Sequence, residues 1–142
     1  MLADNKALVR RLFEEVWNQG NLTAIDELFA TSYIRYDPAA PEAKGLAGFK
    51  HFVTTLRRAF PDIEVALEDV IAEGDNMAAR AIWRGTHQGE YLGIAPTGRQ
   101  VAVMGTVTLR IVHDKFQEGW LNMDTLGLLQ QLGAIPPLGQ IL

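Results

Sequence analysis

The sequence predicts an α+β fold in which a strongly curved antiparallel sheet wraps around N-terminal helices to form a cone. Two observations lead to this prediction. Apolar residues recur at intervals of three and four over most of residues 4–60, which is typical of helices, and they alternate with polar residues from Ile63 onward, which is typical of strands. Because the helices come first and the strands follow, we expect the helices to pack on one face of a curved sheet.

The first half of the chain predicts three helices and one short strand. Asp4 or Asn5 can cap the first helix, and Gly20 suits the left-handed residue that ends it. A short second helix follows directly. The pattern then changes to a strand over residues 33–36, and Gly45 opens a third helix with a long apolar stripe.

The second half predicts four long antiparallel strands. A hairpin turn at residues 73–76 follows the first of them, and the chain returns over 77–83. A long strand over 100–112 turns tightly at His113–Asp114 and comes back over 115–124.

The C-terminal part predicts a short helix over residues 125–132, followed by the uncharged apolar tail AIPPLGQIL. An apolar tail left in water is a liability. We therefore expect it to pack on the domain or across a dimer contact.

Length and composition limit the classes of function. A chain of 142 residues predicts a single domain over residues 1–142. The net charge is −4 and there is no Lys/Arg-rich run, so nucleic acid is not an expected partner. The N-terminus lacks a signal-peptide core, and no apolar run is long enough to span a bilayer, so we expect a cytoplasmic protein with no membrane partner. The absence of cysteine and of HxH or HExxH spacing predicts no metal site.

The stretch RGTHQGEYLGIAPTGR, residues 84–99, predicts an elaborated loop between two strands. Loops held on a rigid scaffold often carry function, which draws attention to His87 and Glu90. His87 either carries a proton near neutral pH, as histidine can, or braces the loop by bonding to the backbone or to Glu90.

Several segments resemble the SnoaL-like polyketide cyclases, also called ester cyclases, within the nuclear-transport-factor-2-like (NTF2-like) superfamily. The resemblance implies a cone-shaped α+β barrel that forms a homodimer through the outer face of its sheet. It also implies an intramolecular aldol closure without metal or cofactor, with an aspartate on the last strand as general acid/base and a polar helper on the strand before it. The matching segments are GTHQGEYLGIAPTGR (85–99), VWNQGN (16–21), YIRYDP (33–38), GLAGFKHF (45–52) and TLGLLQQLG (125–133).

The resemblance does not carry over completely at the catalytic positions. Counting without gaps from Pro96 places the aspartate of the cyclases opposite Leu121 and their histidine helper opposite Val107, and neither side chain can transfer a proton. A one-residue bulge near Trp120 would shift this register. Tyr36 stands where relatives often have histidine.

Asp124 is the strongest remaining carboxylate. It follows the last strand, where it can act as a general base at the cavity floor or cap the helix that begins at Thr125. Tyr36 and Asn122 are candidates to bind a ligand carbonyl or hydroxyl inside the cone, and Tyr36 equally suits the rim. A set of apolar residues completes the candidates for substrate binding. They either line the cavity or belong to the core: Trp17, Trp83, Met104, Val107, Trp120 and Leu121.

These features lead to three hypotheses about function. The first is a cofactor-independent cyclase, isomerase or hydrolase that acts on a small apolar molecule with carbonyl groups. The second is a non-catalytic binding module of the same fold, and the third is a dimeric scaffold whose cone is filled. The polarity and size of the cavity discriminate among them.

Overall fold

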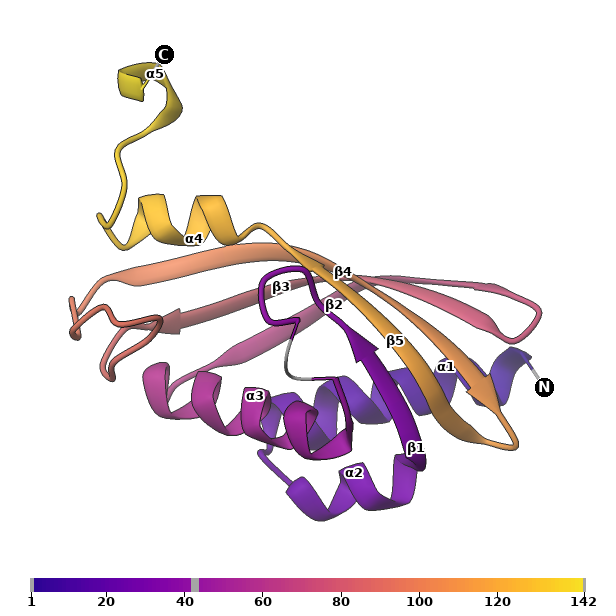
Figure 1. Cartoon of the computed structure of the whole chain (residues 1–142). Helices are drawn as coiled ribbons and strands as arrows, with labels where there is room; N and C mark the ends of the chain where they lie inside the picture. Colours follow the sequence, from indigo (N-terminus) through magenta and orange to yellow (C-terminus); the bar gives the residue numbers. More distant parts are fainter. Residues whose placement is uncertain (1, 42–43, 142) are drawn as a thin grey trace.

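The computed structural model describes residues 2–41 and 44–141 (Figure 1). It confirms the α+β class and the cone: a curved five-stranded sheet lies over helices from the first half of the chain. In chain order the elements are α1 (Leu2–Arg11), the π-helix η1 (Leu12–Asn18), α2 (Leu22–Leu28), β1 (Phe29–Tyr36), α3 (Leu46–Ala59), β2 (Glu64–Glu73), β3 (Asn76–Thr86), β4 (Gln100–Val112), β5 (Lys115–Met123), α4 (Thr125–Gln131) and α5 (Leu138–Ile141).

The sheet has the strand order β1-β5-β4-β3-β2. The four strands of the second half form the predicted antiparallel meander. The prediction of a strand over 33–36 was too short, because β1 begins at Phe29. The sequence also gave no sign that β1 pairs in parallel with β5, which places Tyr36 opposite Trp120.

Strand alternation divides the side chains of the sheet between two faces. On β4, Val101, Val103 and Leu109 are buried in the core on the side toward the helices, whereas Ala102 and Met104 face outward and are exposed. Each strand continues this division, because neighbouring residues of a strand point to opposite faces. We call the two sides the inner face, toward the helices, and the outer face.

The first predicted helix changes type halfway along. It starts as α1 and continues as η1, where the backbone N–H of Gln19 donates to the carbonyl of Glu14 at 3.0 Å. The side-chain amide of Asn18 then donates to the carbonyl of Val65 at 3.0 Å and accepts from its N–H at 2.7 Å, which ties η1 to the edge strand β2. Hydrophobic periodicity does not separate an α-helix from one π-helical turn, so the sequence did not predict η1.

The predicted boundary between the first two helices is confirmed. Gly20 has a φ of 70°, and a Cβ placed there would lie 2.5 Å from the Arg57 side chain. Asn21 caps α2, since its side-chain oxygen accepts from the N–H of Thr23 at 3.2 Å. Glycine is thus required at position 20 for both its backbone conformation and its lack of a side chain.

The C-terminal helix α5 lies away from the sheet and from the other helices (Figure 1). Leu138 on it is about half exposed. The tail therefore does not pack on its own domain at this residue, and the last residue, Leu142, lies outside the described residues. Within residues 2–41 and 44–141, no helix is both long and apolar enough to cross a membrane.

Gln131 protects the edge of β4 beyond the end of β5. The last β5 residue, Met123, pairs with Gly105, so the first residues of β4 extend past their neighbour. There the Gln131 side chain donates to the carbonyl of Ala102 at 2.9 Å and accepts from its N–H at 2.8 Å. A side-chain amide thus takes the place of a peptide group in the next strand.

We predict that Gln131→Ala lowers the free energy of unfolding by about 1–2 kcal/mol, since two backbone groups lose their partners at a partly solvated edge. Chemical denaturation measures the change. The matched control is Gln130→Ala, since Gln130 makes one long contact of 3.4 Å to the carbonyl of Pro136. Equal stabilities of the two variants would contradict this role for Gln131.

Candidate functional site

The interior of the cone is almost filled by side chains. The hollow that remains measures about 20 Å³, roughly the space of one water molecule. The Trp17 ring packs edge-on against the Trp83 ring, with centroids 5.9 Å apart. The hollow is lined by Leu12, Phe13, Trp17, Tyr33, Arg35, Phe49, Trp83, Val107, Leu109, Gly119, Trp120 and Leu121.

Val107 and Leu121 are direct partners across β4 and β5, and both line this hollow. The register between these strands runs without a break from Gly105 to Arg110, so there is no bulge at Trp120; the irregularity follows Arg110 instead. The two positions where the resemblance expects an acid/base pair are thus adjacent, on the inner face and apolar.

Trp83 places a polar group in the interior of the cone. Its indole N–H is buried and has no hydrogen-bond partner in the described part of the chain. The ring also borders a second small hollow next to Phe60, Val103 and Leu128. A buried donor without an acceptor is uncommon in proteins, so this N–H is available to an acceptor atom that enters the interior.

The expectation that Tyr36 and Asn122 face the inside of the cone is wrong. Tyr33 and Arg35 of β1 occupy the inner face, so Tyr36 stands on the outer face, 40% exposed. Its ring stacks on Trp120 at 5.3 Å between centroids. Leu121 likewise takes the inner face, which turns Asn122 outward and exposes it.

The outer face also holds Met104, which the sequence had grouped with the cavity lining; it is 50% exposed. Further along the strands, Glu118 accepts from Arg110 at 2.7 Å and from the Tyr36 hydroxyl at 3.1 Å. The hydrogen bond from Arg110 holds the pKa of Glu118 below its usual value, and donation to Glu118 raises the pKa of Tyr36.

Asp124 is the N-cap of α4. Its Oδ1 accepts from the N–H of Gly127 at 2.8 Å, and its carboxyl group is exposed. Its own backbone N–H donates to the carbonyl of Met104 at 2.9 Å, which fixes the point where the chain leaves the sheet. The capping interpretation is confirmed.

His87 is fully buried and braces the loop that contains it. Its Nδ1 accepts from the backbone N–H of Thr97 at 3.1 Å and lies 3.0 Å from the Thr97 hydroxyl oxygen. The bracing interpretation is therefore confirmed, with Thr97 as the partner and Glu90 exposed. Nε2 is buried without a partner in the described residues, and the ring packs on Phe60 with centroids 5.5 Å apart.

The base of the same loop is fixed to the end of α3. The backbone N–H groups of Gln88 and Gly89 both donate to the carbonyl of Ala59, at 2.9 and 3.0 Å. A Cβ at position 89 would lie 2.5 Å from the carbonyl oxygen of Arg58, so this close approach requires glycine. The loop over residues 85–99 is thus held at both ends and presents its middle to one end of the cone.

That end carries a cavity of about 240 Å³, which we call the mouth cavity. It lies between the chain after β1, helix α3, the middle of the 85–99 loop and the junction of β5 with α4. Most of its surface is apolar. Its described lining residues are Asp37, Ala39, Ala40, His51, Phe52, Thr55, Tyr91, Leu92, Met123 and Thr125.

The carboxylate of Asp37 is already engaged in an ion pair and a hydrogen bond within the protein. Its carboxylate is buried, accepts from Arg35 at 2.6 Å and accepts from the N–H of Ala39 at 2.9 Å. The Arg35 guanidinium lies 4.1 Å from the centroid of the Phe52 ring. The pair therefore shapes the wall of the mouth cavity.

Tyr91 and His51 are the other titratable groups of the mouth cavity, and sequence reasoning assigned neither a role. Burial, and then the charge of Asp37, raise the pKa of Tyr91, so its phenol keeps its proton and can donate. His51 is exposed, and its Nε2 lies 3.5 Å from the hydroxyl of Thr55. The spacing of four residues between His51 and Thr55 on one helix was the available signal.

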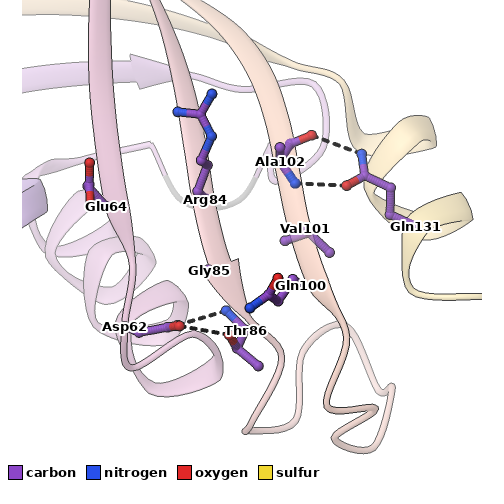
Figure 2. Close-up of a pocket in the computed structure, with 9 residues that line it drawn as sticks. All are labelled: Asp62, Glu64, Arg84, Gly85, Thr86, Gln100, Val101, Ala102 and Gln131. Atoms are coloured by element: carbon purple, nitrogen blue, oxygen red, sulfur yellow. Dashed lines mark hydrogen bonds between the residues drawn. The ribbon is translucent and has the colours of Figure 1, made fainter.

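A groove of about 480 Å³, lined mostly by polar residues, lies on the outer face (Figure 2). Asp62 accepts from the N–H and the hydroxyl of Thr86, both at 2.7 Å, and the N–H contact in particular lowers the pKa of Asp62. Gln131 is bonded to Ala102, so three of the polar side chains that line the groove, Asp62, Thr86 and Gln131, have partners within the protein. No group of three or more His, Cys, Asp or Glu residues that could hold a metal occurs within the described ranges.

We predict that His87→Ala lowers the free energy of unfolding by about 2–4 kcal/mol, because it opens a cavity beside Phe60 and leaves the Thr97 N–H without its acceptor. Thermal and urea denaturation measure the loss. Gln88→Ala, at the exposed neighbouring position, serves as the control. An unchanged stability of His87→Ala would contradict the bracing role.

Comparison with known proteins identifies the fold. The chain is 33% identical over 132 residues to the aklanonic acid methyl ester cyclase DnrD of Streptomyces peucetius, covering 89% of this chain and 88% of the relative. Among solved structures it is similar to AclR of Streptomyces galilaeus, a proposed hydroxylase, with a TM-score of 0.86, 29% identity and coverage of 96% and 85% of the two chains.

A second solved structure, assigned to the SnoaL-like polyketide cyclases and from Jannaschia sp. CCS1, has a TM-score of 0.86 and 26% identity, covering 94% of both chains. Residues 7–132 match the family described as SnoaL-like polyketide cyclase. The match takes in the sheet, the helices beneath it and the 85–99 loop. The chain belongs to the SnoaL-like polyketide cyclase family.

Proposed function

We propose that this protein binds a small, apolar, carbonyl-containing molecule of polyketide type in the mouth cavity and closes a ring in it by cofactor-independent aldol chemistry. The main support is the 33% identity, over most of both chains, to a cyclase of aklanonic acid methyl ester. The mostly apolar lining of the mouth cavity, which is open to solvent, supports such a ligand.

The chemistry requires a base next to a carbon that carries an acidic hydrogen. The base takes the proton, the resulting enolate carbon attacks a second carbonyl carbon of the same molecule, and the new alkoxide takes a proton back. His51 is the mouth-cavity residue that we assign as the base, because Asp37 is held by Arg35. The Tyr91 hydroxyl, which keeps its proton, is the donor assigned to the enolate oxygen.

Walls that hold a flexible substrate in one folded pose supply the rest of the rate. An intramolecular reaction gains from positioning, because the reacting carbons are kept within bonding reach. Phe52 and Met123 offer apolar surface on two different elements of the mouth cavity for this purpose.

Asp124 is the other candidate base. It is a candidate because the next residue, Thr125, borders the mouth cavity. The Oδ1 of Asp124 also accepts the hydrogen bond that caps α4. Asparagine at this position keeps a capping oxygen but cannot take a proton, so the two candidate bases are separable by substitution.

We predict that His51→Gln slows ring closure by about 10²-fold or more, the size expected for loss of a general base, while Asp124→Asn leaves turnover within a few fold. The substrates are aklanonic acid methyl ester and simpler open-chain 1,3-dicarbonyl esters, and chromatography with mass spectrometry follows the isomeric ring product. His113→Gln, in the β4–β5 turn, is the matched histidine control. The reverse pattern, with turnover lost only in Asp124→Asn, would assign the base to Asp124.

A non-catalytic binding protein is the second candidate function. The apolar pair of Val107 and Leu121 favours it, because the inner face offers no proton-transfer group at these two positions. Tight binding of the dicarbonyl ester by the wild type, with no ring product and no exchange of its acidic hydrogens into deuterated water, would establish this alternative.

We also propose that the protein forms a homodimer through its outer face. The exposed Met104 and the stacked rings of Tyr36 and Trp120 give this face an apolar surface. Glu64 and Arg84 stand opposite each other beside the outer groove, so a second copy related by a two-fold axis can offer complementary charge (Figure 2).

We expect Met104→Glu to convert the dimer to a monomer, because a carboxylate at an apolar contact is left desolvated. Light scattering after size-exclusion chromatography measures the mass. Leu22→Glu, an exposed leucine on α2 away from the sheet, is the control. A wild-type monomer, or a dimer that withstands Met104→Glu and depends on Leu22, would refute this interface.

A further inference from the structure

Leu92 lies in a backbone conformation that leucine rarely adopts. Its φ is 52°, and the next residue, Gly93, has a φ of 77°. On either side, Tyr91 and Ile94 exchange two backbone hydrogen bonds of 3.1 and 2.8 Å. Two positive φ angles between paired residues define a type I′ turn, for which Asn-Gly is the preferred sequence. A leucine in the first position is therefore unfavourable for the backbone.

The side chain of Leu92 is also in an unfavourable environment for an apolar group. It is 56% exposed, and it borders the mouth cavity. Neither turn formation nor burial in the core explains leucine here, since asparagine would satisfy the turn and interact better with water. Residues held against their backbone preference gather at sites of function.

The turn is positioned firmly by its surroundings. The Tyr91 ring packs edge-on against Phe60, with centroids 5.9 Å apart, and the base of the loop is fixed by the contacts of His87 with Thr97. Leu92 is thus held at the edge of a cavity whose other walls include Phe52 and Met123. An apolar ligand that enters the cavity meets the Leu92 side chain without a loop rearrangement.

Another two-residue turn with two positive φ angles makes the contrast clear. His113 and Asp114 join β4 to β5 with φ angles of 50° and 60°. Both are residue types that tolerate the left-handed region, and neither borders the mouth cavity. Among described non-glycine residues with positive φ, Leu92 alone is apolar.

We propose that Leu92 is a ligand-binding residue that sets the affinity of the mouth cavity for apolar, ring-shaped carbonyl compounds, at the expense of turn stability. This inference rests on the proposed function, namely that the mouth cavity holds the ligand. The inference predicts two opposite effects of replacing Leu92. The stability of the protein rises, because leucine is unfavourable in the turn, and the affinity for the ligand falls, because an apolar contact is lost.

The test uses the full-length protein and 2-acetylnaphthalene, an apolar aromatic ketone whose fluorescence reports its surroundings. We expect Leu92→Asn to raise the melting temperature by about 3 °C, because the turn becomes Asn-Gly. The same variant weakens binding of the probe about fivefold to tenfold, as expected for loss of one half-buried leucine contact. Leu92→Met, which stays apolar, keeps most of the affinity.

His113→Asn is the matched control, since it places asparagine at the first position of another turn with two positive φ angles. It leaves binding of the probe unchanged. If Leu92→Asn binds the probe as tightly as the wild type, or is less stable than the wild type, the role of Leu92 is overturned. The mouth cavity then still stands as the ligand site. A wild type that does not bind the probe, or an Ala40→Trp variant that binds it as tightly as the wild type, would overturn the mouth cavity as the ligand site and this inference with it.

Discussion

The alternation of side chains along β4 and β5 is the constraint on which the rest of the structure depends. Once Leu121 faces the helices, Val107 must face them too, and Asn122 and Met104 must face outward. A shift of one residue would exchange these two sets. The regular pairing between Gly105 and Arg110 prevents that exchange, so the composition of the inner face follows from register alone. The helices then fill the space that an apolar inner face leaves.

Much of the fold was accessible from sequence, because each signal was local. The helix end at Gly20, the helix start at Gly45 and the turns at residues 73–76 and 113–114 depend on a few neighbouring residues and were predicted correctly. The parallel pairing of β1 with β5 joins segments far apart in the chain, and no local pattern encodes it. The assignment of Tyr36 to the cone failed for the same reason, since its face is decided by that pairing.

The site shows a similar division. The family resemblance and the count along the strands led to Val107 and Leu121, which face each other across β4 and β5. The composition of the 85–99 loop led to the bracing role of His87. The mouth cavity instead combines residues from α3, the 85–99 loop and the end of β5. Their proximity arises from the way α3 anchors the loop through Ala59, a tertiary contact that sequence spacing does not reveal. The polar groups of this family member thus lie nearer the rim than the resemblance implies.

The contact between Gln131 and Ala102 has a consequence for solubility. A strand that extends past its neighbour presents free N–H and C=O groups, which are a template for pairing with other chains. Here that template is hidden by one amide side chain at the end of the short helix α4, and a short helix frays more readily than a strand separates from a sheet. Fraying of α4 would expose the end of β4 while the remaining sheet stays folded. Edge-to-edge aggregation of this protein would then begin from a nearly native molecule.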